Sequence, residues 1–322
     1  MHTSKTHLTL IASAITAALA LTACDSSNSS DNDMAQFSLA VSDSPVDRAD
    51  AVVVCFSGIE LVGNGMGNQR YLIGDDAVAV EANDACVDDS GNVIPNTRGV
   101  DLLTLQGADS EALIERAELP AGSYGQLRLD ITDGGYVEVD GERHPIRIPS
   151  NQLRLDGPTL TAGGNFDYTL EFDLRRALRN PPGQDGYLLT PRGVRLVDNV
   201  DVGHLQGEVA EQLLINQNCD VAPSDLRDPV AAVYLFEGSD LELADLQGNS
   251  DSDDDAYTSV AVRFDNVDSY EFKIGFIESG EYFAALTCDT NDDPEMATDL
   301  EFIQGQNVTI QSGSTTTIRF EE

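Results

Sequence analysis

The chain has 322 residues, 41% of them apolar, which is enough to build folded cores and argues against wholesale disorder. At about 150 residues per domain, this length predicts two domains after removal of a leader. With 18 basic and 56 acidic residues, the formal net charge is −38. Such a charge argues against nucleic-acid binding and disfavours electrostatic docking onto anionic lipid. Lysine occurs only at Lys5 and Lys273, so the acidic surface indicates solvation in a salty medium.

The N-terminus has the pattern of a bacterial secretory leader. Lys5 lies in a short basic region, and the apolar stretch from Leu8 to Leu21 is shorter than the ~20 residues that cross a bilayer. The next residues complete the motif Leu21-Thr22-Ala23-Cys24, which resembles the lipobox of bacterial lipoproteins. The resemblance implies a signal peptide over residues 1–23, cleavage before Cys24, and a diacylglycerol with acyl chains such as palmitate on Cys24. The alternative is an ordinary signal peptide with a chance cysteine.

Residues 24–36 form a polar tether, because Asp25 to Asp33 contains no apolar residue. No later stretch is long enough to span a membrane, so we expect the body of the protein to hang from lipid in the bacterial cell envelope. Asp25 directly after the cysteine resembles the inner-membrane retention signal of enteric bacteria. The outer membrane and the periplasmic face of the inner membrane both stay open.

Five cysteines are present, and four remain if Cys24 carries lipid. An even number in an oxidising compartment predicts disulfides. Domain organisation favours Cys55–Cys86 and Cys219–Cys288, and each bond would stabilise the fold by ~3–4.5 kcal/mol on the chain-entropy view. Buried free thiols are the alternative. No Cys-x-x-Cys motif occurs, so neither a zinc ribbon nor a thioredoxin site is supported.

Residues 37–202 are dominated by strands in which apolar and polar residues alternate. One such strand places Phe166, Tyr168, Leu170 and Phe172 on one face and Asp167, Thr169, Glu171 and Asp173 on the other. Residues Asp109 to Leu119 break this alternation and predict a short helix, with Leu113 and Ile114 inside and Pro120 ending it. We therefore predict an all-β protein whose first domain is a β-sandwich with one short helix.

Residues 203–322 contain six or seven further short strands at regular spacing, which predicts a second β-sandwich. Gly280-Glu281-Tyr282 at the start of a strand resembles the Gly-x-Tyr edge of transthyretin-like or carboxypeptidase-regulatory-like modules. The resemblance implies a transthyretin-like fold for this second domain.

The first domain also resembles a known family. Its opening strand leads into Ser42-Asp43-Ser44-Pro45-Val46-Asp47, and matching segments follow in order at residues 51–56, 59–61, 100–103, 119–124, 126–129, 148–150 and 187–191. This series, from about residue 36 to 201, resembles the bacterial family named only as a domain of unknown function (DUF 4382). The resemblance implies a secreted or lipid-anchored β-domain and brings no known activity, ligand or catalytic residue. The insertion around Cys86, from Asp84 to Asn96, has no match in the family pattern.

The residues themselves favour a structural role for the opening motif. Asp43 before Ser44-Pro45 has the pattern of an Asx-type turn. The mature chain has two histidines, His144 and His204, which fall in different predicted domains. His-Glu-x-x-His and Gly-x-Ser-x-Gly are absent, so metalloprotease and serine-hydrolase sites of these types are unsupported. Carboxylate pairs are uninformative among 56 acids, and the absence of tryptophan argues against a sugar-stacking cleft. We therefore expect no enzyme and no resident cofactor.

Two acidic loops raise calcium as an alternative, because they concentrate hard oxygen ligands. The first resembles the start of an EF-hand, but Ala256 and Val262 stand where that motif needs Gly and Glu. Chance clusters are expected in so acidic a chain. The candidate ligands are Asp251, Asp253, Asp255, Asp289, Asp292 and Asp293.

The sequence thus predicts a non-catalytic, lipid-anchored envelope protein of two β-sandwiches that acts as a binding or structural module. Its partners would be a membrane, through the N-terminal lipid, and an envelope protein or glycan that the sequence does not specify. Two rival hypotheses are a calcium-stabilised adhesion module and an extracytoplasmic hydrolase that uses acidic residues.

Overall fold

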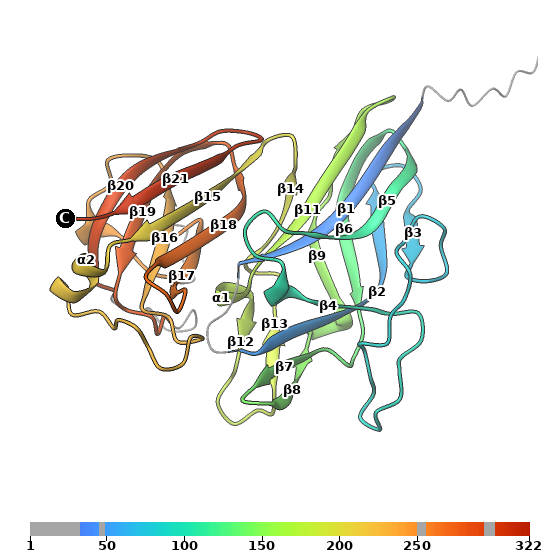
Figure 1. Cartoon of the computed structure of the whole chain (residues 1–322). Helices are drawn as coiled ribbons and strands as arrows, with labels where there is room; N and C mark the ends of the chain where they lie inside the picture. The colour runs from blue at the N-terminus through green and yellow to red at the C-terminus, as the bar shows by residue number, and fades with distance from the viewer. Residues whose placement is uncertain (1–32, 45–48, 250–255, 293–299) are drawn as a thin grey trace, which may run out of the picture.

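The computed structural model describes residues 33–44, 49–249, 256–292 and 300–322 (Figure 1). It is 54% strand and 7% helix, which confirms the all-β prediction. Strands β1 to β14 make an N-terminal module, and strands β15 to β21 make a C-terminal module beside it.

The N-terminal module contains two sheets. The four-stranded sheet has the order β14 (Val194–Asp198), β11 (Asn165–Asp173), β1 (Met34–Ser44) and β5 (Glu111–Pro120). The main path of the ten-stranded sheet is β10 (Thr159–Leu160), β6 (Gly122–Ile131), β2 (Ala51–Gly63), β7 (Tyr136–Val139), β8 (Glu142–Arg147), β13 (Tyr187–Leu189) and β12 (Leu178–Arg179). On that sheet, β2 also pairs with β3 (Gln69–Leu72) and β4 (Arg98–Asp101), and β6 also pairs with β9 (Gln152–Asp156).

The core of this module lies between its two sheets. Alternate residues of β1 and β11 point into it, and Phe37, Leu39 and Leu170 are almost completely buried there. Three short helices join the strands: η2 (Leu102–Thr104), η3 (Pro149–Asn151) and α1 (Leu174–Ala177). Asp101 caps η2, since its carboxylate accepts a hydrogen bond from the Leu103 N–H.

The helix predicted over Asp109 to Leu119 is wrong, because most of that segment is strand β5, which pairs antiparallel with β1. Register shifts around Leu39 interrupt the alternation of β5, and Arg116 adopts a φ of 50°. The buried residues consequently fall at Leu113, Ile114, Ala117 and Leu119, a spacing that imitates one face of a helix.

The C-terminal module is a seven-stranded sheet. Its order is β20 (Phe302–Ile310), β19 (Gly280–Thr287), β16 (Ala231–Glu237), β17 (Thr258–Phe264), β18 (Tyr270–Glu278), β15 (Val202–Val209) and β21 (Thr315–Phe320). Two short helices, α2 (Glu211–Asn216) and η4 (Leu243–Asp245), lie on the connections. Both faces of β16 are buried: Val233 and Leu235 belong to the main core, and Tyr234 and Phe236 to a second cluster on the other side.

The two predicted disulfides are confirmed, one in each module. Cys55 of β2 is bonded to Cys86 with 5.9 Å between their Cα atoms, and Cys219 is bonded to Cys288 with 5.1 Å. The first disulfide ties the insertion around Cys86 to the ten-stranded sheet. In the described part of the chain, no helix is long and apolar enough to cross a membrane.

Candidate functional site: the junction of the two modules

The charged face of β11 lies at the junction between the modules. Alternation places Thr169, Glu171 and Asp173 on the face of the sheet that points away from its core, where the sequence predicts solvent. All three are instead at most 2% exposed, because β17 and β18 of the C-terminal module pack against β1 and β11. Figure 1 shows α1, which directly follows β11, at the boundary of the two modules. The junction is therefore built on buried charge.

Three buried carboxyl groups lie at this junction, and burial raises the pKa of each. Glu171 is fully buried, and desolvation raises its pKa to about 8 although the Arg195 charge opposes the shift. Desolvation also raises the pKa of Asp173, with the Arg176 and Arg195 charges opposing. The pKa of Asp43 lies well above its ordinary value because of burial, then because of the negative charges of Glu171 and Asp173. Glu171 and Asp173 share the charge of Arg195, which opposes the effect of burial on both pKa values.

Two arginines of the N-terminal module reach across to the two residues that precede β17. Arg176 Nη1 donates a hydrogen bond to the Ala256 carbonyl at 3.0 Å, and Arg195 Nη1 donates to the Tyr257 carbonyl at 3.0 Å. The Arg195 guanidinium also lies 4.0 Å from the centre of the Tyr257 ring, a cation–π contact. In the opposite direction, Thr258 Oγ1 donates to Asp173 Oδ2 at 2.9 Å. Strand β17 is thus held by reciprocal polar contacts.

A second polar cluster adjoins the first on the outer face of β16. Tyr234 is fully buried, its hydroxyl donates to Asp292 Oδ2 at 2.8 Å, and Arg175 lies 5.7 Å from the centre of its ring. The same Asp292 oxygen accepts the Asn249 N–H at 2.7 Å. Burial and the neighbouring Asp292 raise the pKa of Tyr234, while Arg175 opposes the shift, so the phenol stays a donor.

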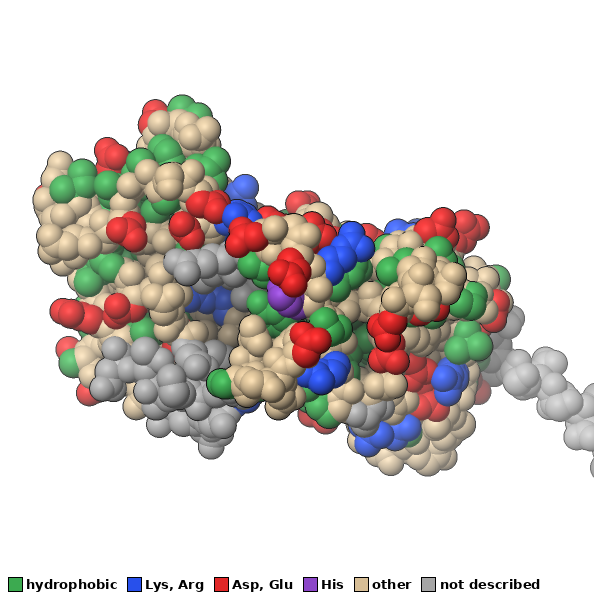
Figure 2. Space-filling model, turned by 90° about the horizontal axis from the view of Figure 1, so that it is seen from below, with side chains coloured by type: hydrophobic (Ala, Val, Ile, Leu, Met, Phe, Trp, Pro, Cys, Tyr) green, Lys and Arg blue, Asp and Glu red, His purple; other side chains and the backbone are tan. Residues whose placement is uncertain are grey.

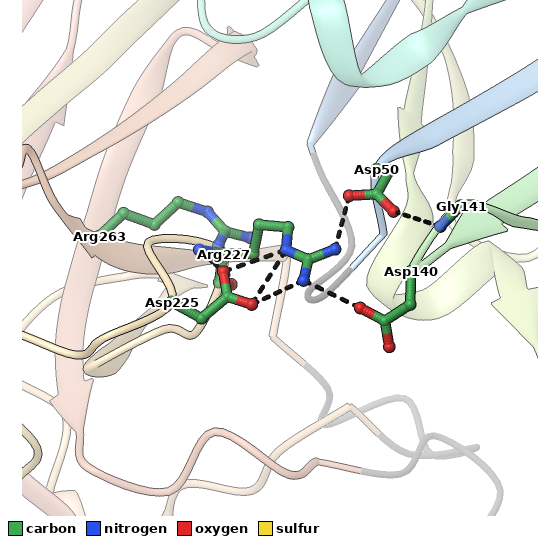
Figure 3. A network of polar contacts seen from close by, with 6 residues as sticks. All are labelled: Asp50, Asp140, Gly141, Asp225, Arg227 and Arg263. Carbon is green, nitrogen blue, oxygen red and sulfur yellow. Dashed lines mark hydrogen bonds and ion pairs between the residues drawn. The ribbon is translucent and has the colours of Figure 1, made fainter.

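At the surface, one arginine of the C-terminal module bridges to the N-terminal module (Figure 3). Arg227 Nη1 lies 2.5 Å from Asp50 Oδ1, and Nη2 lies 2.9 Å from Asp140 Oδ1. Asp225 holds the same guanidinium from its own module at 2.6 Å, and Asp50 also accepts the Gly141 N–H at 3.2 Å. These three carboxylates raise the pKa of Arg227. Because the hydrogen bonds of a planar guanidinium are directional, these contacts restrict the relative orientation of the two modules as well as their separation.

Away from the junction, the charged side chains of the described residues are exposed, at least in part, and not buried. Figure 2 shows acidic side chains scattered over both modules, with arginines between them, on the face seen from below. Exposed arginines pair with acids on nearby strands: Arg70 of β3 reaches across β2 to Asp130 of β6 at 2.6 Å, and Arg319 pairs with Glu208 on the neighbouring strand at 2.8 Å. Pairs of this kind contribute ~0–1 kcal/mol and mainly keep the surface hydrated.

The chemistry of the junction is that of a docking contact. Glu171 and Asp173 lie under the C-terminal module, and acid catalysis needs a carboxyl group that a substrate can reach. Among the residues that the structure describes, no group of three His, Cys, Asp or Glu side chains is placed to hold a metal ion. Buried charges of this type are costly unless they are paired, so they select one relative position of the two modules.

The residues singled out in the sequence have different outcomes. Cys24, Asp251, Asp253, Asp255 and Asp293 lie outside the described residues, so lipidation and the calcium site stay predictions. Asp289 and Asp292 are described, and both accept backbone hydrogen bonds: Asp289 from the Glu301 N–H at 3.0 Å and Asp292 from the Asn249 N–H.

The two histidines lie in separate modules. His144 on β8 contacts the Tyr187 ring, and His204 on β15 contacts Phe276. Asp43 is the last of the alternate buried residues of β1. The Asx-type turn predicted at Asp43 depends on residues 45–48, which lie outside the described residues.

The arginines of the junction were not predicted from the sequence. One signal was available: the acidic residues of β11 end at Asp173, and two arginines, Arg175 and Arg176, follow almost at once. Arg195 and Tyr257 meet only through the tertiary fold, and nothing in their local sequence marks them.

Comparison with solved structures gives only distant likenesses. A leucine-rich repeat protein from Bacteroides thetaiotaomicron is 14% identical with a TM-score of 0.24, and the match covers 89% of this chain and 26% of that one. A minor pilin, GBS52, from Streptococcus agalactiae is 11% identical with a TM-score of 0.17, covering 88% and 94%. A candidate cell adhesion protein from Bacteroides fragilis is 11% identical with a TM-score of 0.20, covering 88% and 92%.

The chain therefore spans about a quarter of the length of the leucine-rich repeat protein. No curated protein matches the sequence. The transthyretin-like resemblance of the C-terminal module stays a prediction.

The comparison with protein families gives a firm result for the N-terminal module. Residues 34–191, just under half of the chain, match the family described as a domain of unknown function, DUF4382. The match spans β1 to β13 and includes Asp43, Glu171 and Asp173 of the junction. The N-terminal module therefore belongs to the DUF4382 family.

Proposed function

We propose that the chain is a lipid-anchored, non-catalytic protein of the bacterial cell envelope, and that its two β-modules act together as one binding or structural unit. The observation that carries this proposal is the pairing of four of the five cysteines, with one disulfide in each module. Structural disulfides persist in oxidising compartments outside the cytoplasm. The remaining cysteine is Cys24, the last residue of the lipobox-like motif.

The position of β1 supports the anchor. Strand β1 begins at Met34, ten residues after Cys24, and all of the intervening residues are polar. A lipid on Cys24 would hold the folded body near a bilayer through this tether, since two or three acyl chains are needed for stable anchoring.

The junction supports a non-catalytic role. Glu171 and Asp173 are buried at the contact with the C-terminal module, where both interact with the Arg195 charge and Asp173 accepts the Thr258 hydroxyl. Locked modules present a continuous surface, which suits recognition of an envelope protein or a glycan.

Mass spectrometry of the intact protein from membranes of a producing bacterium tests the proposal. We expect a polypeptide that begins at Cys24 and carries the mass of a diacylglycerol and an acyl chain. Cys24→Ser should release the protein from the membrane fraction. The matched control, in which Cys55 and Cys86 are both changed to Ser, should keep the lipid mass. An unacylated polypeptide, or one that begins at another residue, would contradict the proposal.

A further inference from the structure

A cavity of about 530 Å³ opens at one side of the N-terminal module, between β9 of the ten-stranded sheet and β14 of the four-stranded sheet. Both are edge strands, since β9 pairs only with β6 and β14 only with β11. The volume falls in the range of ~300–1,000 Å³ typical of small-molecule sites. Its walls come from β9, β14, the middle of β6 and the loop that precedes β14. The cavity therefore lies where the two sheets of the sandwich separate.

The charge of this cavity is opposite to that of the chain. Three arginines, Arg154, Arg192 and Arg195, line it, against the single acid Asp156. The whole chain has 18 basic and 56 acidic residues, so this local excess of positive charge is unusual. A concave site lined by one sign of charge concentrates the field and attracts ions of the opposite sign.

The pairing of β6 with β9 places Arg154 of the cavity beside a second arginine, Arg128. Arg154 lies directly opposite Arg128, and like charges in that position repel each other. Arg128 is balanced by Glu60 at 3.1 Å, and it also donates to the Gln126 side-chain oxygen at 2.8 Å. Arg154 is exposed, and among the described residues it donates only to the Gln152 side-chain oxygen, at 3.3 Å. No ion pair with a described residue neutralises Arg154, so a bound anion would relieve the repulsion.

The remaining polar groups are held in place. Arg195 lines the wall nearest the junction, and its guanidinium is held there by the Tyr257 carbonyl and ring and shares its charge with Glu171 and Asp173. Gln126 lines the cavity, and its side-chain oxygen already accepts from Arg128. Its amide N–H groups are therefore the part of that side chain suited to a ligand oxygen.

We propose that this cavity binds a compact organic carboxylate, either a free dicarboxylic acid or the uronate unit of a glycan. The guanidinium fork matches a carboxylate in two parallel hydrogen bonds. Leu155, Val194 and Leu196 provide an aliphatic wall for the body of the ligand. No aromatic side chain lines the cavity, so ring stacking does not contribute to recognition.

The proposal deepens the proposed function by naming a ligand class, and its test is independent of lipidation. Calorimetric titration of the purified full-length protein at low salt uses succinate and galacturonate as probes. Galactose and succinamide serve as neutral analogues of the same size. We expect both acids to bind and both neutral analogues to fail. Binding of succinate alone would assign the site to free dicarboxylic acids, and binding of galacturonate alone to glycan uronates.

Two variants locate the binding. Arg154→Gln should weaken it by about tenfold or more, as expected for a lost charge-assisted pair. Arg319→Gln removes the same charge from an exposed site on the C-terminal module and should leave the affinity unchanged within about twofold. Thermal melts confirm that both variants fold, and Arg154→Lys should retain part of the affinity. Absence of binding by both acids, equal binding of the neutral analogues, or an unchanged affinity in Arg154→Gln would overturn the proposal.

Discussion

Gly275 of β18 and Gly107 of the loop after η2 meet backbone to backbone at the junction. A Cβ atom on Gly275 would lie 1.7 Å from the Gly107 carbonyl oxygen, far inside contact distance. The two modules can approach this closely only because Gly275 carries no side chain. The docking described above therefore depends on a steric requirement as well as on charge.

Gly275→Ala should consequently weaken the docking of the modules. Because the obstructing atom is backbone, the modules have to separate locally, and we expect a loss of stability of about 2–4 kcal/mol. Urea unfolding measures the loss, and limited proteolysis should show new cleavage near residues 256–258. Gly125→Ala is the matched control, since Gly125 also lies within a strand and has open space around it. Equal stability of the two variants would show that the contact is not needed.

Thr258→Val tests the buried hydrogen bond between the modules. Valine keeps the shape of threonine but cannot donate to Asp173 Oδ2, which leaves that carboxylate with less compensation. We expect the free energy of unfolding to fall by about 1–3 kcal/mol in urea titrations. Thr309→Val, which removes an exposed hydroxyl bound to Glu281, should cost less than about 0.5 kcal/mol. The hypothesis fails if the buried variant is as stable as the wild type.

Glu171 makes stability depend on pH in a defined direction. Burial raises its pKa from 4.5 to about 8, so the folded state binds more protons than the unfolded state between these values. Stability from this group is therefore present below the lower value and is lost as the pH rises through about 8. Glu171→Gln should remove this decline and be more stable than wild type by about 1–3 kcal/mol at pH 9.

Urea unfolding across pH 5 to 9 measures this difference, with Glu118→Gln on the exposed side of β5 as control. The Asp43 and Asp173 carboxyls, with raised pKa values, contribute slopes of the same sign and remain in both variants. A wild-type slope that survives in Glu171→Gln would show that other groups carry the dependence.

The disulfides should differ in their contribution to stability. The Cys55–Cys86 bond closes a separation of 31 residues and Cys219–Cys288 one of 69. Replacing each pair by serine should cost about 3.5 and 4.5 kcal/mol, because the longer loop restricts the unfolded chain more. Urea unfolding of the two double variants measures these losses. Thiols that react with iodoacetamide in the unfolded, unreduced protein would contradict both bonds.

Local patterns predicted much of the fold. The alternation of Phe166 to Asp173 identified β11, and the cysteine positions identified both disulfides. The segment that became β5 was misread, because a bulge at Arg116 changes the phase of alternation and a single chain does not reveal its partner strand. Four buried residues at helical spacing do not establish a helix, because a bulged strand can produce the same spacing.

The junction was beyond the reach of these patterns for a different reason. Glu171 and Asp173 lie on the polar side of an amphipathic strand, and that side is normally exposed. Only contact with a second module reveals that it is buried. Arg195 and Tyr257 are 62 residues apart in the chain, and no local signal connects them.

The placement of β1 has a mechanical consequence. This strand follows the N-terminal segment and lies between β11 and β5. Its residues from Gln36 to Ser44 all pair with β11. A pull on the tail along the strand would strain these cross-strand hydrogen bonds in shear, all together, and would not peel them apart one at a time. The module should therefore resist extension from this end far better than from an edge strand.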